Sequence, residues 1–263
     1  MSIPPGRSPA GRPVLVTRPA GRGDALLAQL RDRGIAAEHR PFTRLVPQEG
    51  SSLRADLEEL AAGSFTHLVL TSRTAVDVLL SVRAEDGRSL LHVPASTAVV
   101  AVGTGTAAQL EAAGLAARLV AGGSGAALVE AMPPARPGDR VLFPASSAAS
   151  RTVPEGLAGK GYAVREVVAY RPCPVPPGPD LARRLRDGAY AAIVLTSPMI
   201  ARLAAALGIP PTTAVVTIGA PTTRAARAAG MTVRIQAAAP SDAALADAVL
   251  AVLSPPGASA PRT

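Results

Sequence analysis

Four turns rich in hydroxyl residues and glycine are the parts of this sequence best suited to chemistry, because they could bind an anion. Each follows a short apolar run and precedes an alanine- or leucine-rich stretch; they are Thr71–Ser72, Gly103–Thr106, Thr196–Ser197 and Gly219–Thr222. A hydroxyl there can cap the helix that follows, and the free backbone N–H groups of the helix start attract negative charge. Serine and threonine also cap helices where nothing binds, so one such turn says little. Four together favour a cleft lined with anion donors.

Other kinds of chemistry are poorly represented in the sequence. The segment from Gly103 fits the dinucleotide fingerprint G-x-G-x-x-A, but no carboxylate follows about twenty residues later to hold a ribose. In the similar segment further along, Pro221 replaces the second glycine. Cys173 is the only cysteine, and the three histidines have no ligand-like spacing, so we expect no metal. The sequence also has no Walker loop, and we expect no cofactor.

Six apolar runs provide the strands that must position these turns. They lie near Val14, Val69, Val100, Leu142, Val194 and Val216. Helical stretches follow most of them, and this alternation predicts an α/β fold. The runs are continuous rather than alternating, which predicts parallel strands covered on both faces. In such a sheet ligands bind beyond the carboxyl ends of the strands, where the four turns lie.

The chain also contains an internal duplication. The segment Ala98–Gly114 resembles Ala214–Gly230, with eight of seventeen positions identical. Similar pairs surround Ser72 and Ser197, so the pattern predicts two similar domains. The proline-rich stretches 132–138 and 171–180 have the composition of stiff connectors between them. Residues 1–13 and 254–263 have the composition of disordered ends.

The overall composition favours an anionic small-molecule partner. The 263 residues carry a formal net charge of +8, almost wholly from arginine, since Lys160 is the only lysine. The planar arginine fork suits carboxylates and phosphates, although these arginines could equally be ordinary surface residues. With only 2% aromatic residues and no dense basic run, nucleic acid is a poor candidate. No apolar run is long enough to span a membrane and no secretory signal is recognisable, so we expect a cytoplasmic protein.

Motifs spread over most of the chain resemble those of the uroporphyrinogen-III synthase family. They are "VLVTRPAG" around Arg18, "LTSRTAV" at Ser72, "VGTGTAAQLEAAG" at Thr106, the stretch from Arg151 to Tyr170, "LTSPMIARL" at Ser197, "IGAPTTRAARAAG" at Thr222 and "PSDAALADAV" at Ser241. Each motif alone is weak, but their order and spacing are specific. The sequence departs from the family where Arg73 and Thr74 follow the first Thr-Ser pair in place of asparagine, and where Met199 replaces a serine after the second.

The resemblance implies a specific architecture. Two similar α/β domains with parallel sheets flanked by helices would be joined by a two-stranded β-ladder linker, with the active site in the inter-domain cleft. Residues 1–41 and 174–263 would form the first, discontinuous domain, and residues 43–171 the second. The sequence repeat and the domains therefore need not coincide. The protein would act as a monomer.

The resemblance also implies an activity and roles for particular residues. The family's enzyme is a cyclising lyase that closes hydroxymethylbilane, which carries eight carboxylates, into uroporphyrinogen III with loss of water and inversion of ring D. Tyr170 would donate a proton to the departing hydroxyl, because a neutral acid suffices there. Tyr162 and Tyr190 are expected to be packing residues. The substrate-binding residues would be Arg18, Thr71, Ser72, Gly103, Thr106, Arg151, Ser197, Gly219 and Thr222.

Two other functions stay open on the sequence alone. A non-catalytic relative could use the same cleft as a ligand sensor, although the ten residues after Leu253 are too few for the DNA-binding domain of a regulator. A duplicated α/β protein could instead bind a small anion such as a sugar phosphate. That protein would bind one ligand tightly and have no effect on hydroxymethylbilane.

Overall fold

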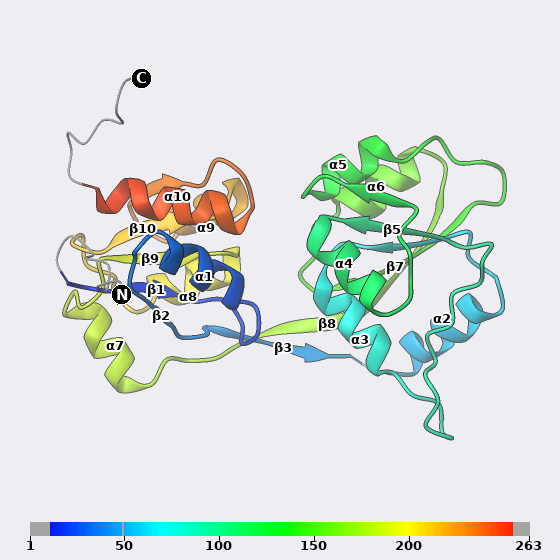
Figure 1. The fold of residues 1–263 in the computed structure, drawn as a ribbon, viewed down its shortest axis with the longest axis horizontal. Coiled ribbons are helices and arrows are strands. Elements are labelled where there is room, and N and C mark those ends of the chain that lie inside the picture. Colours follow the sequence, from blue (N-terminus) through cyan, green and yellow to red (C-terminus); the bar gives the residue numbers. More distant parts are fainter. Residues whose placement is uncertain (1–10, 49, 255–263) are drawn as a thin grey trace, which may run out of the picture. The chain divides into compact units, whose positions relative to one another are not determined.

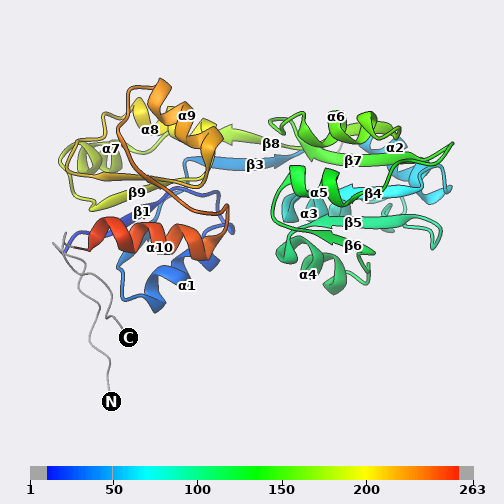
Figure 2. The same cartoon turned by 90° about the horizontal axis from the view of Figure 1, so that it is seen from above.

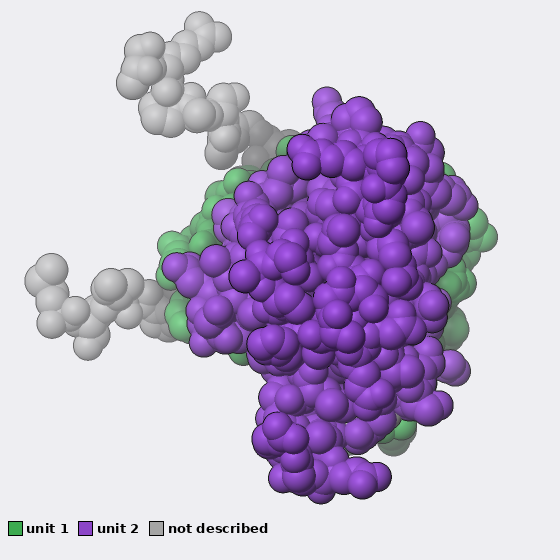
Figure 3. All heavy atoms as spheres, turned by 90° about the vertical axis from the view of Figure 1, so that its right-hand side faces the viewer, with its two compact units in different colours: residues 1–44, 173–263 green, residues 45–172 purple. Residues whose placement is uncertain are grey.

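The chain folds into two compact units, and both chain crossings between them occur within paired strands. The computed structural model describes residues 11–48 and 50–254, so the expectations for most of the leader and for the C-terminal tail lie outside the described residues. Unit 1 comprises residues up to Arg44 and from Cys173 onward, and unit 2 comprises Leu45–Pro172 (Figure 3). Strands β3 (Thr43–Pro47) and β8 (Ala163–Pro174) both run across these boundaries. They are hydrogen-bonded neighbours, which confirms the expected two-stranded ladder.

Unit 1 contains a five-stranded sheet in the order β11-β10-β9-β1-β2 (Figure 1). The pairings in it are parallel. Its elements are β1 (Val14–Val16), α1 (Asp24–Asp32), β2 (Ala37–His39), α7 (Pro179–Arg186), β9 (Ala192–Leu195), α8 (Pro198–Ala205), β10 (Ala214–Thr217), α9 (Ala220–Ala228), β11 (Val233–Gln236) and α10 (Asp242–Leu253).

Unit 2 is built on the same plan, with β3 added at one edge. Its sheet has the order β3-β8-β7-β4-β5-β6, and the strands from β8 to β6 pair in parallel. The remaining elements are α2 (Ser51–Ala61), β4 (His67–Leu70), α3 (Arg73–Ser81), β5 (Ala98–Val102), α4 (Thr104–Ala112), β6 (Leu119–Ala121), α5 (Gly125–Ala131), β7 (Arg140–Ser146) and α6 (Thr152–Gly159).

Helices cover both faces of each sheet, as the continuous apolar runs predict. In unit 1, Leu26 of α1 and Leu245 of α10 pack on the face that carries Val14 and Val16. The opposite face, which carries Leu15, is covered by α7, α8 and α9 (Figure 2). In unit 2, α2, α3 and α4 cover one face and α5 and α6 the other. Alternate residues of each central strand are therefore buried on opposite sides, which requires apolar residues at consecutive positions.

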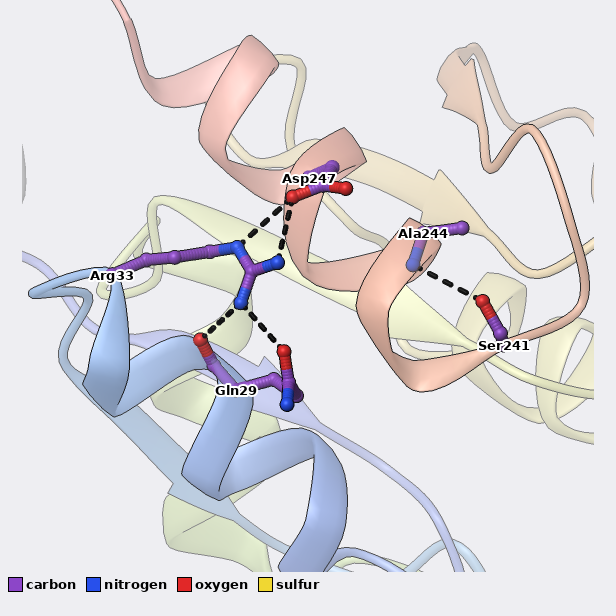
Figure 4. Close-up of polar contacts among 5 residues, drawn as sticks. All are labelled: Gln29, Arg33, Ser241, Ala244 and Asp247. Atoms are coloured by element: carbon purple, nitrogen blue, oxygen red, sulfur yellow. Dashed lines mark hydrogen bonds and ion pairs between the residues drawn. The ribbon is translucent and has the colours of Figure 1, made fainter. Parts of the chain in front are cut away.

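Polar side chains also form contacts at the edge of the packed helices α1 and α10 (Figure 4). Arg33, which ends α1, donates to Asp247 Oδ1 of α10 at 3.0 and 2.8 Å, and to Gln29 Oε1 at 2.7 Å. Ser241 caps α10 by accepting the N–H of Ala244 at 3.2 Å. The Arg33–Asp247 bonds are exposed and contribute little on their own. They orient two helices whose apolar faces are already buried.

The six strands expected from apolar runs are β1, β4, β5, β7, β9 and β10, and all six are confirmed. The duplication is also confirmed, because β4-α3-β5-α4 of unit 2 repeats as β9-α8-β10-α9 of unit 1. One interpretation was wrong. The stretch 132–138 is not a connector between domains but a loop joining α5 to β7 inside unit 2.

Each sheet contains one point where the direction of chain progression reverses. In unit 2 the chain moves from β4 outward to β5 and β6, but from β7 it moves the other way to β8. In unit 1 the corresponding pair is β9, which leads to β10 and β11, and β1, which leads to β2. At such a switch point the two loops leave in opposite directions and open a crevice at the carboxyl ends of the strands. The geometry therefore selects the turns after β4, β7, β9 and β1.

Candidate functional site

The expected donor Tyr170 and the expected substrate-binding Ser72 meet in unit 2. The Tyr170 hydroxyl donates to Ser72 Oγ at 3.1 Å, although 98 residues separate them. Ser72 lies in the turn after β4, next to the switch point, and its Oγ also accepts the N–H of Ala75 at 3.1 Å. Ser72 thus caps α3 as expected, and the cap fixes the oxygen that Tyr170 contacts.

A register shift in the sheet brings Tyr170 to this place. Strand β8 pairs with β7 regularly up to Ala145 and Val168, after which the register shifts so that Ser146 lies opposite Tyr170. The Tyr170 carbonyl accepts the N–H of Ser147 at 2.9 Å, which fixes the backbone there. The ring is half-buried against the core under α2, α3 and α4. Tyr170 is therefore held on a strand, with only its hydroxyl free to change partner.

The Ser72–Tyr170 pair can move a proton without a charged side chain. A serine hydroxyl has one donor and two acceptor positions, and both hydroxyl hydrogens can rotate. When Tyr170 turns its proton toward a ligand, Ser72 can turn its own proton toward the Tyr170 oxygen. The pair would then stabilise a developing phenolate while the Ala75 N–H keeps Ser72 in place.

Removing the Ser72 hydroxyl should affect both stability and rate. We expect Ser72→Ala to lower the free energy of unfolding by about 1 kcal/mol, because α3 loses its cap. Ser124→Ala is the matched control, since Ser124 caps α5 in the same unit by accepting the N–H of Ala127 at 3.1 Å. Urea unfolding should show similar losses for both variants. Only Ser72→Ala should also slow turnover, by about tenfold, because Tyr170 loses its partner; equal rates in the two variants would contradict this role.

The turn after β5 differs from what its side chains suggest. Gly103 begins α4 with a φ of 75°, a conformation that glycine adopts without strain. Thr106 is only 5% exposed, so its hydroxyl faces the core rather than a ligand. Thr104 and Gly105, in contrast, are exposed. Any ligand contact at this turn would therefore use the exposed residues, through their backbone N–H groups or the Thr104 hydroxyl.

Arg151 stands in the turn after β7, on the other side of the switch point. Its side chain is 61% exposed and forms ion pairs with Glu166 and, at 3.5 Å, with Glu155. Exposed pairs of this kind are weak, so the guanidinium can exchange a glutamate for a ligand carboxylate at little cost. Thr71 is half-buried and follows β4, across the switch point from Arg151 and at the same end of the sheet.

In unit 1, Arg18 and Ser197 flank the corresponding switch point. Ser197 follows β9 and caps α8, its Oγ accepting the N–H of Ile200 at 3.2 Å. Arg18 follows β1 and is only 13% exposed, with Nη1 2.5 Å from Asp242 Oδ1. His39 Nε2 also donates to the Arg18 carbonyl at 2.8 Å. Arg18 is therefore held more firmly than Arg151, by an acid at the start of α10.

The turn after β10 repeats the turn after β5 in position but not in backbone conformation. Gly219 has a φ of 176°, an extended value that any residue adopts, so this position does not require glycine. Thr222 is 2% exposed, like its counterpart Thr106. Its neighbour Thr223 is also buried and bonds Thr217 Oγ1 at 2.6 Å and Gln236 at 2.8 Å. The threonines of this turn thus contribute to the interior of unit 1.

Three further residues near these turns were not among the site residues expected from the sequence. Asp242 and Glu166 hold the two candidate arginines, and Arg73 follows Ser72 directly. A signal for Asp242 was present, since an acid after the capping serine of a helix is favourable. Within the described residues, no group of three or more histidine, cysteine or acidic side chains could hold a metal ion. Within the same range, no helix is long and apolar enough to cross a membrane.

A cavity of about 610 Å³ lies at the other end of the strands of unit 1. It is lined by residues that precede β10 and β11 and by the last residues of α10, together with Arg12 and Arg234. Helix carbonyl ends face this region and favour cations rather than anions. Arg12 donates to two loop carbonyls here, those of Gly188 at 2.8 Å and Thr212 at 3.4 Å. We therefore place the candidate site at the carboxyl ends of the strands and not in this cavity.

Comparisons with known proteins relate this chain to uroporphyrinogen-III synthases in both sequence and structure. Residues 24–247 match the family described as uroporphyrinogen-III synthase HemD. The structure is similar to that of a mutant uroporphyrinogen III synthase from Thermus thermophilus, with 20% sequence identity and a TM-score of 0.61, over 92% of this chain and 98% of that chain. It is also similar to uroporphyrinogen-III synthetase from Helicobacter pylori, with 15% identity and a TM-score of 0.62, over 92% and 99% of the two chains. A comparison with curated proteins found no match. The structural likenesses show the fold, and the sequence match covers most of the chain.

Proposed function

Because the chain belongs to the uroporphyrinogen-III synthase family, we propose that it closes hydroxymethylbilane into uroporphyrinogen III at the strand ends described above. The observation that carries the proposal is the family match over residues 24–247, which includes the Ser72–Tyr170 hydroxyl pair beside a switch point. The substrate carries eight carboxylates, which suits a chain with a net charge of +8 and with helix starts, such as those of α4, α6 and α9, that no side chain caps.

In the proposed reaction, Tyr170 assists the loss of the terminal hydroxyl. Its proton moves to the departing oxygen, the C–O bond breaks, and the adjacent pyrrole supplies the electron pair, so water leaves. Ser72 donates to the phenolic oxygen during this step. The substituted carbon of the last pyrrole then attacks the electron-deficient carbon to give a spiro intermediate. This intermediate fragments and recloses with ring D inverted, and the final proton loss restores Tyr170.

The remaining work of the protein is orientation. A flexible linear tetrapyrrole closes by itself, so the enzyme must hold its ends in the arrangement that leads to inversion. We propose that the carboxylates bind Thr71, Ser72, the backbone near Gly103 and Thr106, and Arg151 in unit 2. In unit 1 the proposed contacts are Arg18, Ser197 and the backbone near Gly219 and Thr222.

The two candidate arginines should act on substrate binding rather than on the chemical step. We expect Arg18→Ala and Arg151→Ala each to raise KM several-fold, since each removes a fork of donors for a carboxylate. Steady-state kinetics on purified variants measures this effect. An unchanged KM for either variant would remove that residue from the proposed contacts.

The activity itself can be tested without any added cofactor, because the reaction has no redox step. We expect the purified chain, dialysed against a chelator, to consume hydroxymethylbilane faster than it closes spontaneously and in proportion to enzyme concentration. A rate equal to that of spontaneous closure would reject the proposed function.

We propose further that the protein works in the cytoplasm as a monomer whose ligand is this small molecule rather than nucleic acid. Light scattering should then give the mass of one chain, and cell fractionation should place the protein with cytoplasmic enzymes. A dimer mass, or recovery with membranes, would overturn the corresponding part of this proposal.

A further inference from the structure

Arg73 occupies an unusual place beside the candidate site. It is the first residue of α3, directly after Ser72, and its side chain is half-buried. A Cβ atom built on Gly105 would lie 3.7 Å from Arg73 Cδ and 3.9 Å from Nε. Gly105 is the second residue of α4. The Arg73 side chain therefore lies across the start of the neighbouring helix, and not along its own.

Arg73 has no partner among the described residues. No hydrogen bond or ion pair within that part of the chain involves its guanidinium, in contrast to Arg18 and Arg151. The acid best placed to pair with it is Asp77, one turn further along α3, because residues four apart share a helix face. Asp77 instead accepts a hydrogen bond from Gln109 of α4. The guanidinium thus keeps its donors free although an acid is within one helical turn.

Its position is also unfavourable for stability. Helix starts carry a partial positive charge, so an arginine at the first position of α3 and beside the start of α4 is repelled by both. The same partial charge that favours the acid Asp242 at the start of α10 disfavours the cation Arg73 at the start of α3. A residue that breaks a stability rule with no compensating contact is more easily explained by a bound anion.

We propose that Arg73 is a specificity-determining residue that binds a carboxylate of the substrate, on or next to the pyrrole that carries the departing hydroxyl. The inference rests on the proposed function. Ser72 connects the two groups, because Arg73 follows it in the chain and Tyr170 donates to its Oγ at 3.1 Å. The Tyr170 hydroxyl lies at the end of β4, where it contacts Ser72, and the Arg73 side chain reaches from there toward the start of α4, after the neighbouring strand β5. The two groups are thus separated by about one or two strand spacings of about 5 Å each, the scale of one or two pyrrole rings.

The test compares four proteins in one assay of hydroxymethylbilane consumption at several salt concentrations. They are the parent chain, Arg73→Met, which keeps the length but loses the charge, Arg73→Lys, and the control Arg136→Met. Arg136 is exposed in the loop before β7, at the opposite end of the same sheet. We expect Arg73→Met to raise KM about tenfold with a much smaller change in kcat, and Arg73→Lys to raise it less. Arg136→Met should match the parent. Added salt should raise the KM of the parent more than that of Arg73→Met.

Thermal unfolding of the same variants separates a binding role from a structural one. Arg73→Met should melt at the temperature of the parent or above it, because the substitution removes the repulsion between a cation and the starts of α3 and α4. A lower melting temperature would assign Arg73 to stability and overturn the inference. A parental KM in Arg73→Met, with an active parent, would overturn the inference alone. An inactive parent would reject the proposed function and this inference with it.

Discussion

Replacing Tyr170 by phenylalanine is expected to slow turnover on the order of 100-fold, with little change in KM. General acid catalysis by a positioned side chain contributes roughly this much or more. The variant keeps the ring that packs against the core of unit 2 and loses only the hydroxyl that donates to Ser72 at 3.1 Å. Single-turnover kinetics on hydroxymethylbilane would measure the chemical step apart from product release.

Tyr162→Phe is the matched control for this prediction. Tyr162 immediately precedes β8, the strand that carries Tyr170 near its other end. It is buried, and its hydroxyl donates to the Pro133 carbonyl at 3.0 Å. Both variants should lose about 1 kcal/mol of unfolding free energy, since each loses one hydrogen bond. Only Tyr170→Phe should lose activity, and a parental rate in that variant would reject Tyr170 as the proton donor.

The largest stability effect is expected from Glu38→Gln in unit 1. Both Glu38 oxygens accept from Arg184 of α7, at 3.1 and 2.8 Å, and the buried Tyr190 hydroxyl donates to Oε2 at 2.9 Å. Arg40 adds a bond at 2.7 Å. The glutamate thus connects β2 to α7 and to Tyr190, two residues before β9. We expect its neutralisation to lower the unfolding free energy by about 2 kcal/mol at pH 7, because charge-assisted bonds are lost and a buried tyrosine keeps a weaker acceptor.

This effect should depend on pH in one direction. The hydrogen bond from Arg184, with those from Arg40 and Tyr190, lowers the pKa of Glu38 from 4.5 to about 2 against the opposing effect of burial. Burial and the bond to Glu38 raise the pKa of Tyr190 to about 12. A carboxylate with a lowered pKa stabilises the folded state above its unfolded pKa, and this contribution is lost as pH falls through the folded value.

Urea unfolding of the parent and Glu38→Gln between pH 7 and pH 2 tests this prediction. The difference between the two proteins should be constant above about pH 5 and should shrink as the pH falls toward about 2. Glu111→Gln is a control, because Glu111 is exposed on α4 and has no ion pair within the described residues. A difference that stays constant over the whole range would contradict the role given to the Glu38 charge.

The central strands and their turns could be predicted from the sequence, whereas the contacts between them could not. Val14, Val69 and Val216 lie in continuous apolar runs because helices cover both faces of their strands. The edge strands β2 and β11 contain charged or polar residues, since edge positions are only partly covered, and so they carry no comparable signal. The composition of 132–138 does not distinguish a loop inside a domain from a linker, because proline suits a tight turn as well as a linker.

The candidate site shows the same division. Ser72 and Ser197 were expected as helix caps, and both cap their helices, because capping depends on local sequence. The bond between Ser72 and Tyr170 depends instead on a register shift between Ala145 and Ser146, which no local pattern records. The side chains of Thr106 and Thr222 are buried, so a role in binding at these two turns depends on backbone N–H groups and not on the threonine hydroxyls. The sequence does contain a signal for Arg73, because it places a cation at a helix start, where acids are preferred. The family resemblance marks the same residue only as a departure from the usual motif.

The measurement that tests the account most directly is the isomer composition of the product. Purified chain is supplied with hydroxymethylbilane, the porphyrinogens are oxidised, and the type I and type III porphyrins are separated. Spontaneous closure gives type I, so we expect type III to predominate and its share to rise with enzyme concentration. Tyr170→Phe should shift the product back toward type I. Type I alone, at every concentration of the parent chain, would contradict the claim that this protein inverts ring D.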